Sequence, residues 1–309
     1  MKILFMGTPD FAVPSLIKLT NNGYIPSVVI TGLDRKRGRG QKINPTPVKI
    51  AAVEMGIPVL EPKNLKDPEF HRKIEKFDVD LSCVVAFRIL PQELIDIPRL
   101  GSINLHASLL PKYRGAAPIQ RAIMAGEKET GATTFFIQRK VDTGNILFQK
   151  KLEIGNNENF GTLHDRLSGA GAGLLLKTVK AIESDSHIED IQDNSQATDA
   201  PKINRDDLRI DWNRSAIEIH NQVRALSPYP GVTTKFNGKV LKIFSTVTGE
   251  YISPKRTHGQ IIEVGKDFFA VSTGDGCIKV LEVQREGKRR MTTANFLKGV
   301  SISTKDSMS

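Results

Sequence analysis

The stretch Ile3-Leu4-Phe5-Met6-Gly7-Thr8-Pro9-Asp10 sets the pattern for the first part of the chain, because an apolar run ends in a turn and a helix-like segment follows. Asp10 can cap a helix that begins at Phe11. The alternation continues with apolar runs at residues 28–31, 59–60, 81–86 and 102–105. Strands that alternate with helices are typical of a mostly parallel sheet, so we predict a Rossmann-like α/β fold.

The turn after the first apolar run disfavours a nicotinamide cofactor. Gly7-Thr8-Pro9-Asp10 lacks the three glycines that let a pyrophosphate approach the start of a helix. The opening residues have no small-residue cleavage pattern, so we expect a first strand there and not a signal peptide. No apolar run reaches the roughly 18 residues that span a bilayer, so we expect a cytoplasmic protein without a membrane partner.

The composition is ordinary for a globular protein, but the charge is not. Of 309 residues, 39% are hydrophobic and 25% are charged, which allows two packed domains. The formal net charge of +10 suggests an acidic partner, with nucleic acid the first candidate, although many basic proteins bind nothing specific. Cys83 and Cys277 lie far apart inside apolar runs, so we expect buried, reduced thiols.

The pattern changes after a polar segment that has no apolar period, from Glu183 to Asp207. A helix is expected from Ala216 to Leu226, and short strands separated by Gly, Asn and Asp turns follow it. Such strands indicate a small antiparallel OB-like barrel, a type that often binds oligonucleotides. We therefore predict a first domain over residues 1–183, a linker over 184–207 and an OB-like second domain over 208–309.

Asn104 and His106 are two residues apart at the end of a predicted strand, so their side chains share one face at the carboxyl edge of the sheet. An amide beside an imidazole can stabilise the oxygen that becomes negative when an amine attacks an acyl carbon. From the spacing alone, two solvated polar residues at a strand end remain the commoner case.

Three separate segments stand in an order that is typical of one enzyme family. Asn104-Leu105-His106 leads into Ser108-Leu109-Leu110-Pro111-Lys112-Tyr113-Arg114-Gly115; Val141-Asp142-Thr143-Gly144 follows it, and Ala86-Phe87-Arg88-Ile89-Leu90-Pro91 precedes it. The chain thereby resembles the 10-formyltetrahydrofolate-dependent formyltransferases. Their pattern is an Asn-X-His strand end, a Ser-Leu-Leu-Pro-X-Tyr-Arg-Gly loop, an Asp-Thr-Gly segment and a folate-binding segment that ends in Ile-Leu-Pro.

The resemblance implies a catalytic trio of Asn104, His106 and Asp142. Asn104 would donate to the oxyanion formed when a neutral amine attacks the formyl group of 10-formyltetrahydrofolate. His106, if protonated, would add charge stabilisation, and Asp142 would orient the imidazole and help to move the proton. No metal is implied. The residues implied for folate binding are Arg88, Ile89, Leu90, Ser108, Leu109, Leu110 and Pro111.

Asp142 could instead belong to a different kind of site or to none. Asp142-Thr143-Gly144 could be half of an aspartic protease dyad, but no second Asp-Thr-Gly or Asp-Ser-Gly occurs in the chain. Asp142 could also be a simple turn residue before glycine. The flanking Gln138-Arg139-Lys140 departs from the family, which usually has Met and an acidic residue here, and it adds positive charge near the site.

Two basic regions suggest which molecule receives the formyl group. Asp34 to Lys42 holds five cationic residues in nine, and residues 205–309 hold 17 Lys and Arg against 11 Asp and Glu, a net of +6. Family members that formylate methionine on initiator tRNA carry such an insertion and a second domain, so the resemblance implies a tRNA partner. The implied contacts are Arg35, Lys36, Arg37, Arg39, Lys42, Lys202, Arg285, Lys288, Arg289 and Arg290. Solvated loops account for the same charges equally simply.

Two further functions stay open from the sequence. Related enzymes formylate the amine of a sugar nucleotide, and they also join this first domain to a barrel-like second domain. From another class, the chain could be a non-catalytic RNA-binding protein on the same fold. No obligate protein partner is evident from the sequence.

Overall fold

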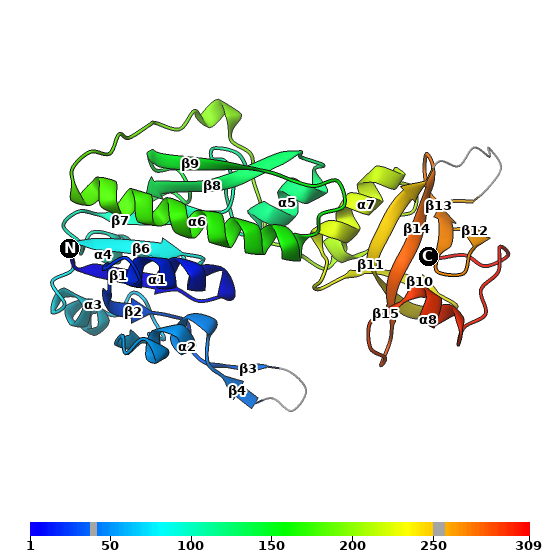
Figure 1. Cartoon of the computed structure of the whole chain (residues 1–309), viewed down its shortest axis with the longest axis horizontal. Helices are drawn as coiled ribbons and strands as arrows, with labels where there is room; N and C mark the ends of the chain where they lie inside the picture. The colour runs from blue at the N-terminus through cyan, green and yellow to red at the C-terminus, as the bar shows by residue number, and fades with distance from the viewer. Residues whose placement is uncertain (38–41, 250–256) are drawn as a thin grey trace. The chain divides into compact units, whose positions relative to one another are not determined.

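The computed structural model describes residues 1–37, 42–249 and 257–309, which form two compact units (Figure 1). Unit 1 contains Met1–Ala116, Glu129–Glu153 and His164–Ala200. Unit 2 contains Ala117–Lys128, Ile154–Leu163 and Pro201–Ser309. Two short segments that precede the last part of unit 1 in the sequence therefore belong to unit 2. In the described residues, no helix is both long and apolar enough to cross a membrane.

Unit 1 is built on a seven-stranded sheet in the order β5-β2-β1-β6-β7-β8-β9. The strands are β1 (Ile3–Gly7), β2 (Pro26–Ile30), β5 (Val59–Leu60), β6 (Leu81–Val85), β7 (Ser102–His106), β8 (Glu129–Phe136) and β9 (Ile146–Glu153). The first five run parallel to one another, β8 pairs antiparallel to β7, and β9 pairs antiparallel to β8. The predicted mostly parallel α/β fold is confirmed.

Helices connect the parallel strands, as the sequence predicted, and two further helical segments follow β9. They are η1 (Asp10–Ala12), α1 (Val13–Thr20), α2 (Pro47–Glu54), α3 (Pro68–Glu75), α4 (Gln92–Ile95), α6 (Phe160–Glu183) and the short η2 (Asn194–Gln196). Thr46 caps α2 by accepting a hydrogen bond from the Lys49 amide at 3.1 Å. The predicted cap at Asp10 is wrong, because Asp10 is the first residue of a 3₁₀ turn and α1 begins three residues later.

Both faces of the sheet are covered. Leu4 and Met6 on one face pack in a buried cluster with residues of α3 and α4. On the opposite face, a side chain added at Gly171 of α6 would come within 2.8 Å of Leu105 in β7. Thr178 of α6 also shares a 2.7 Å hydrogen bond with Thr134 of β8. Leu105 therefore lies under α6, and its neighbours Asn104 and His106 face the other way.

The described residues of the basic insertion include two short antiparallel strands, β3 (Arg35–Arg37) and β4 (Lys42–Asn44), where the sequence indicated only a loop. Asp34, directly before β3, is held by an ion pair, since Lys49 Nζ lies 2.7 Å from both Asp34 Oδ2 and Glu61 Oε2. The hydrogen bond from Lys49 lowers the pKa of Asp34. Arg39 lies outside the described residues.

Unit 2 is built on an antiparallel sheet in the order β10-β11-β14-β13-β12, with β15 paired to β14. The strands are β10 (Val232–Phe236), β11 (Lys239–Gly249), β12 (Ile261–Val264), β13 (Phe269–Ser272), β14 (Cys277–Arg285) and β15 (Met291–Thr292). The helices are α5 (Pro118–Met124), η3 (Asp206–Leu208), α7 (Ala216–Ala225) and α8 (Thr293–Leu297). This arrangement confirms the predicted antiparallel second domain.

Helix α7 closes the core of unit 2. Its buried residues Ile219 and Val223 pack in one cluster with Ile243 and Val280 of the sheet. The helix begins at a capping box, in which Ser215 and Glu218 each bond the other's backbone amide. Hydrogen bonds from Arg214 and Ser215 lower the pKa of Glu218 to about 2.

The chain passes from unit 1 to unit 2 between Ala200 and Pro201, inside the predicted linker. The predicted domain limits themselves stay a prediction. Residues 184–200 pack as part of unit 1, and Gln192 and Ala200 within them are buried. Cys83 and Cys277 are buried and free, as the sequence predicted, and burial raises the pKa of both thiols.

Candidate active site

The end of β7 presents an amide and an imidazole on one face of the sheet. Asn104 lies beside Val84 of β6, and Val84 belongs to the buried cluster on the face opposite α6. The Asn104 side chain is half-buried, and it has no hydrogen-bond partner among the described residues. A half-buried amide without a protein partner is free to bond a ligand.

His106 is held by the loop that follows it. Its side chain is buried, and Nε2 lies 2.8 Å from the carbonyl oxygen of Tyr113. Because a carbonyl only accepts, Nε2 must carry the hydrogen in this bond. Nδ1 is therefore the nitrogen left to gain or lose a proton, and it lies 3.8 Å from Asp142 Oδ2. The two groups form an ion pair when the imidazole is protonated.

Asp142 stands in a tight turn between β8 and β9. Its φ of 54° is in the left-handed region, which Asp tolerates better than most residues. Oδ2 accepts a 2.9 Å hydrogen bond from the Gly115 amide, so the carboxylate is anchored to the loop after β7. The structure thus brings together His106 and Asp142, which are far apart in sequence, and places Asn104 on the face that His106 shares.

The turn requires glycine at position 144. A Cβ atom there would overlap the carbonyl oxygen of Phe136, so the backbone would have to move. We expect Gly144→Ala to lower the free energy of unfolding by about 2–4 kcal/mol. Gly173→Ala is the matched control, because a Cβ at this position in α6 meets no atom within 4 Å. It should be neutral or stabilise by about 0.5–1 kcal/mol.

Denaturant unfolding followed by circular dichroism measures both glycine variants. Equal stability of the Gly144 and Gly173 variants would show that the turn of Asp142 tolerates a side chain at Gly144.

The residues predicted to bind folate fall into two groups. Arg88 and Ile89 are exposed, Ile89 by 77%, and they follow Ala86, whose φ is 47°. Ser108 and Leu110 are buried and support the loop. The Ser108 hydroxyl donates to the Lys112 carbonyl at 2.6 Å. Leu90 is buried, and Leu109 and Pro111 are partly buried. Folate contacts at these residues stay a prediction.

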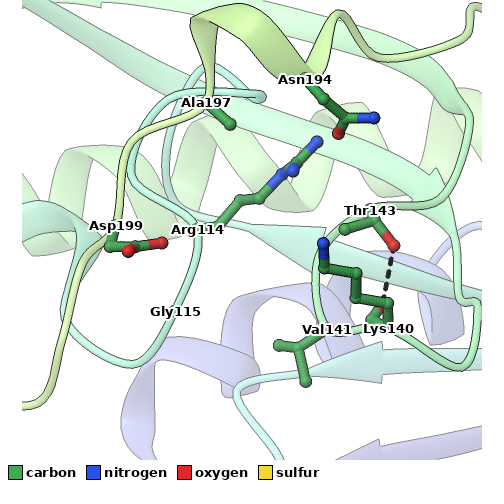
Figure 2. Close-up of a pocket in the computed structure, with 8 residues that line it drawn as sticks. All are labelled: Arg114, Gly115, Lys140, Val141, Thr143, Asn194, Ala197 and Asp199. Carbon is green, nitrogen blue, oxygen red and sulfur yellow. Dashed lines mark hydrogen bonds between the residues drawn. The ribbon is translucent and has the colours of Figure 1, made fainter.

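A cavity of about 420 Å³ flanks the turn of Asp142 (Figure 2). It is lined by Arg114, Gly115, Lys140, Val141, Thr143, Asn194, Ala197 and Asp199. Figure 2 shows the Arg114 side chain reaching toward Asn194, and the Thr143 hydroxyl bonded to the Lys140 carbonyl at 2.8 Å. Lys140 belongs to the segment that departs from the family pattern, and it does add positive charge beside the site.

The segment from Gln192 to Thr198 bonds the turn of Asp142 and the loop after β7, and the sequence did not predict that it belongs to the site. Gln192 is 5% exposed, and its amide bonds Arg114 and the carbonyl oxygens of Asp142 and Gly144. Thr198 accepts from the amides of Tyr113 and Arg114. The polar composition of this segment is that of a linker, and the partners lie about 50 to 85 residues away in sequence. No local pattern reveals such pairs.

The residues predicted to contact tRNA are spread over several elements. Arg35, Lys36 and Arg37 form β3, and Lys42 starts β4. Lys202 is exposed, and so is the turn between β14 and β15 that carries Arg285, Lys288 and Arg289. Arg290 differs from the others, since its guanidinium pairs with Glu282 and lies over the Phe244 ring at 4.5 Å. The Arg290 side chain therefore already makes contacts within unit 2.

Metal-ligand clusters are not found in the described part of the chain, where no group of three or more His, Cys, Asp or Glu could hold an ion. The arrangement at the end of β7 offers a hydrogen-bond donor, a titratable imidazole and a carboxylate. These groups suit acyl transfer between nitrogen atoms.

Solved structures with a similar fold include two sugar-related formyltransferases. The sugar 3N-formyl transferase WlaRD, crystallised with dTDP and 5-N-formyl-THF, covers 94% of this chain and 99% of its own, with a TM-score of 0.68. An N-formyltransferase from Helicobacter canadensis, in complex with folinic acid and dTDP-3-aminofucose, has a TM-score of 0.69 and covers 92% and 99%. Both are only 23% identical in sequence, so they support the fold alone.

Sequence relatives are much more similar. The methionyl-tRNA formyltransferase of Syntrophus aciditrophicus is 45% identical over 308 residues, 98% of this chain and 97% of the relative. The enzyme of the same name from Porphyromonas gingivalis is 42% identical, with the same coverage. Residues 1–179 match the family model of formyl transferases, and residues 202–301 match that of the formyl transferase C-terminal domain. The chain therefore belongs to the formyl transferase family, among relatives named methionyl-tRNA formyltransferase.

Proposed function

We propose that this chain transfers the formyl group of 10-formyltetrahydrofolate to the amino group of methionine on initiator tRNA, and so supports translation initiation. The observation that carries the chemistry is the contact of His106 Nδ1 with Asp142 Oδ2 at 3.8 Å, on the strand face that also holds Asn104, whose amide has no partner in the described residues. The acceptor follows from the relatives that align over nearly the whole chain. Since charged tRNA is the acceptor, we expect the enzyme to act in the cytoplasm.

The reaction exchanges one carbon–nitrogen bond for another. The bond from the formyl carbon to N10 of the folate breaks, a bond to the methionine nitrogen forms, and one proton passes from the attacking nitrogen to the leaving one. The Asn104 amide donates to the formyl oxygen as negative charge grows there. His106 and Asp142 hold and pass the proton, with Nδ1 as the exchanging atom.

The surroundings of the site suit an acidic acceptor. Arg114 and Lys140 line the cavity beside Asp142, against the single carboxylate of Asp199. Phosphate groups near the end of a tRNA would meet this positive charge, whereas a neutral metabolite would gain nothing from it. Exposed Arg88 and Ile89, which follow the end of β6, are the side chains most available to the folate.

An acceptor assay tests this proposal. The chain is incubated with 10-formyltetrahydrofolate and either methionyl initiator tRNA or an amino-sugar nucleotide, and the formylated product is identified by mass spectrometry. We expect formyl-methionyl-tRNA and no formylated sugar. Transfer to the sugar nucleotide alone would contradict the proposed acceptor while leaving the reaction type in place.

The basic hairpin is proposed to contact the tRNA backbone. Replacing Arg35, Arg37 and Arg39 together by Gln should weaken tRNA binding and reduce the slope of log K against log salt by about two to three, because each lost phosphate contact removes about 0.7–0.9. Filter binding over a range of salt concentrations measures the slope.

The matched control removes three positive charges elsewhere in unit 1. Arg72 and Lys73 are exposed on α3, and Lys76 is exposed directly after it. Replacing these three by Gln should leave the slope unchanged if the hairpin makes the contacts. The same slope in both triple variants would favour a merely solvated hairpin.

A further inference from the structure

We propose that Gln192 is a positioning residue for formyl transfer: its buried amide fixes the main chain at Asp142, and thereby the direction of the Asp142 carboxylate toward His106. The inference rests on the proposed function, because it assigns Asp142 to the reacting centre. Gln192 would thus have a functional role although it lies in a segment whose composition is that of a linker.

Every hydrogen-bonding site of the Gln192 amide is used. Nε2 donates to the carbonyl oxygens of Asp142 at 3.0 Å and Gly144 at 2.7 Å. Oε1 accepts from Arg114 Nε at 3.2 Å and Arg114 Nη2 at 2.6 Å. An amide has two donor hydrogens and two acceptor lone pairs, so none remains free. With only 5% of the residue exposed, water cannot easily replace these bonds.

These bonds hold Asp142 from two sides. The Gly115 amide binds the side chain at Oδ2, and Gln192 binds the carbonyl oxygen of the same residue. Asp142 has a φ of 54°, a conformation that persists only where the surroundings fix it. Because the carboxylate direction depends on the backbone of the turn, loss of the Gln192 bonds should let Asp142 turn away from His106.

Gln192 is itself held firmly enough to act as a support. On its N-terminal side, Asp190 and Ile146 exchange both backbone hydrogen bonds, at 2.8 and 2.9 Å. On its C-terminal side, the Arg114 amide donates to the Thr198 carbonyl at 2.8 Å, and the Ala200 amide donates to the Arg114 carbonyl at 2.6 Å. The segment is therefore pinned to unit 1 on both sides of the glutamine.

The Gln192→Glu substitution separates positioning from simple support of the fold. A glutamate keeps the size of the side chain and can still accept from Arg114. An ionised carboxylate cannot donate to the carbonyl oxygens of Asp142 and Gly144, and it repels them. We expect kcat to fall about 10- to 100-fold, because a small misplacement of a reacting group has an effect of this size. KM for folate and for tRNA should change less than about threefold.

Gln196→Ala is the matched control. Gln196 is a glutamine of the same segment, but it is exposed, and among the described residues its side chain bonds only Asp193, at 2.9 Å. Its removal should leave kcat unchanged. If Gln192→Glu does not fold, Gln192→Met takes its place, since Met has similar length and no amide donor.

The decisive readout is the coupling between positions 192 and 142. If Gln192 acts through Asp142, the double variant with Asp142→Asn should be as slow as Asp142→Asn alone, because nothing is left to position. A kcat at the wild-type level for the Gln192 variant that folds, or multiplication of the two single effects, would overturn the inference. An unmodified enzyme that does not formylate methionyl-tRNA would instead overturn the proposed function, and this inference with it.

Discussion

Asn104→Ala is expected to lower kcat about 10²- to 10³-fold, the effect of removing one hydrogen-bond donor from a developing oxyanion. The amide is half-buried at the end of β7 and bonds no protein group in the described residues, so its removal breaks nothing in the fold. KM for folate and tRNA should change little, because the bond strengthens only as the formyl oxygen becomes negative. Steady-state formylation of methionyl-tRNA measures both constants.

Asn104→Asp is the companion variant, because it keeps the shape of the side chain and replaces the donor by a negative charge. It should be at least as slow as Asn104→Ala. Full activity of the aspartate variant would mean that position 104 supports the strand end and donates no hydrogen bond to the reacting oxygen.

Asp142→Asn is expected to lower kcat about 10²- to 10⁴-fold, the range for loss of a group that moves protons. Asparagine tolerates the left-handed φ of 54°, and its carbonyl oxygen can still accept from the Gly115 amide. The fold should therefore survive, while the negative charge 3.8 Å from His106 Nδ1 is lost. Steady-state kinetics together with a thermal melt separate the two effects.

The control for Asp142→Asn is an exposed aspartate of the same unit, Asp193, which bonds only its neighbours Ser195 and Gln196. Asp193→Asn should keep the wild-type rate. An Asp142→Asn enzyme that works as fast as Asp193→Asn would remove Asp142 from the reacting centre.

The parts of the fold that the sequence predicts are those with a local cause. The five parallel strands appear as apolar runs between helix-like segments, because strands buried on both faces need apolar residues throughout. The alternation of side chains along β7 likewise placed Asn104 and His106 on one face before any contact was known. The second domain could also be predicted, because short strands and turn residues are local features of the sequence.

The features that the sequence did not predict depend on contacts between distant segments. Gln192 bonds a carbonyl 50 residues away, and its own chain neighbours Ile191 and Asp193 are both exposed. Helix α5 belongs by its contacts to unit 2, although it lies between two strands of unit 1 in the sequence. Four of the six residues of β3 and β4 are basic, so the hairpin lacks the apolar alternation that marks a strand.

Two kinds of residue thus build the site. Side chains at the end of β7 and in the turn of Asp142 are proposed to carry the chemistry, and the family pattern points to them. The supports that aim them are backbone groups, glycines and one buried amide, and only the folded chain brings these together. Gly115 and Gly144 stand in the family pattern, whereas Gln192 does not, so a motif search of this chain would miss the buried amide.

The most direct test of the proposed reaction is single-turnover formylation of methionyl initiator tRNA, with enzyme in excess and saturating 10-formyltetrahydrofolate. The wild-type chain is compared with Asn104→Ala and Asp142→Asn, and tRNA binding is measured in parallel. We predict rapid transfer by the wild-type chain, and at least about 100-fold slower transfer by both variants with unchanged tRNA affinity. No transfer by the wild-type chain, or transfer at its rate by either variant, would contradict the proposed mechanism.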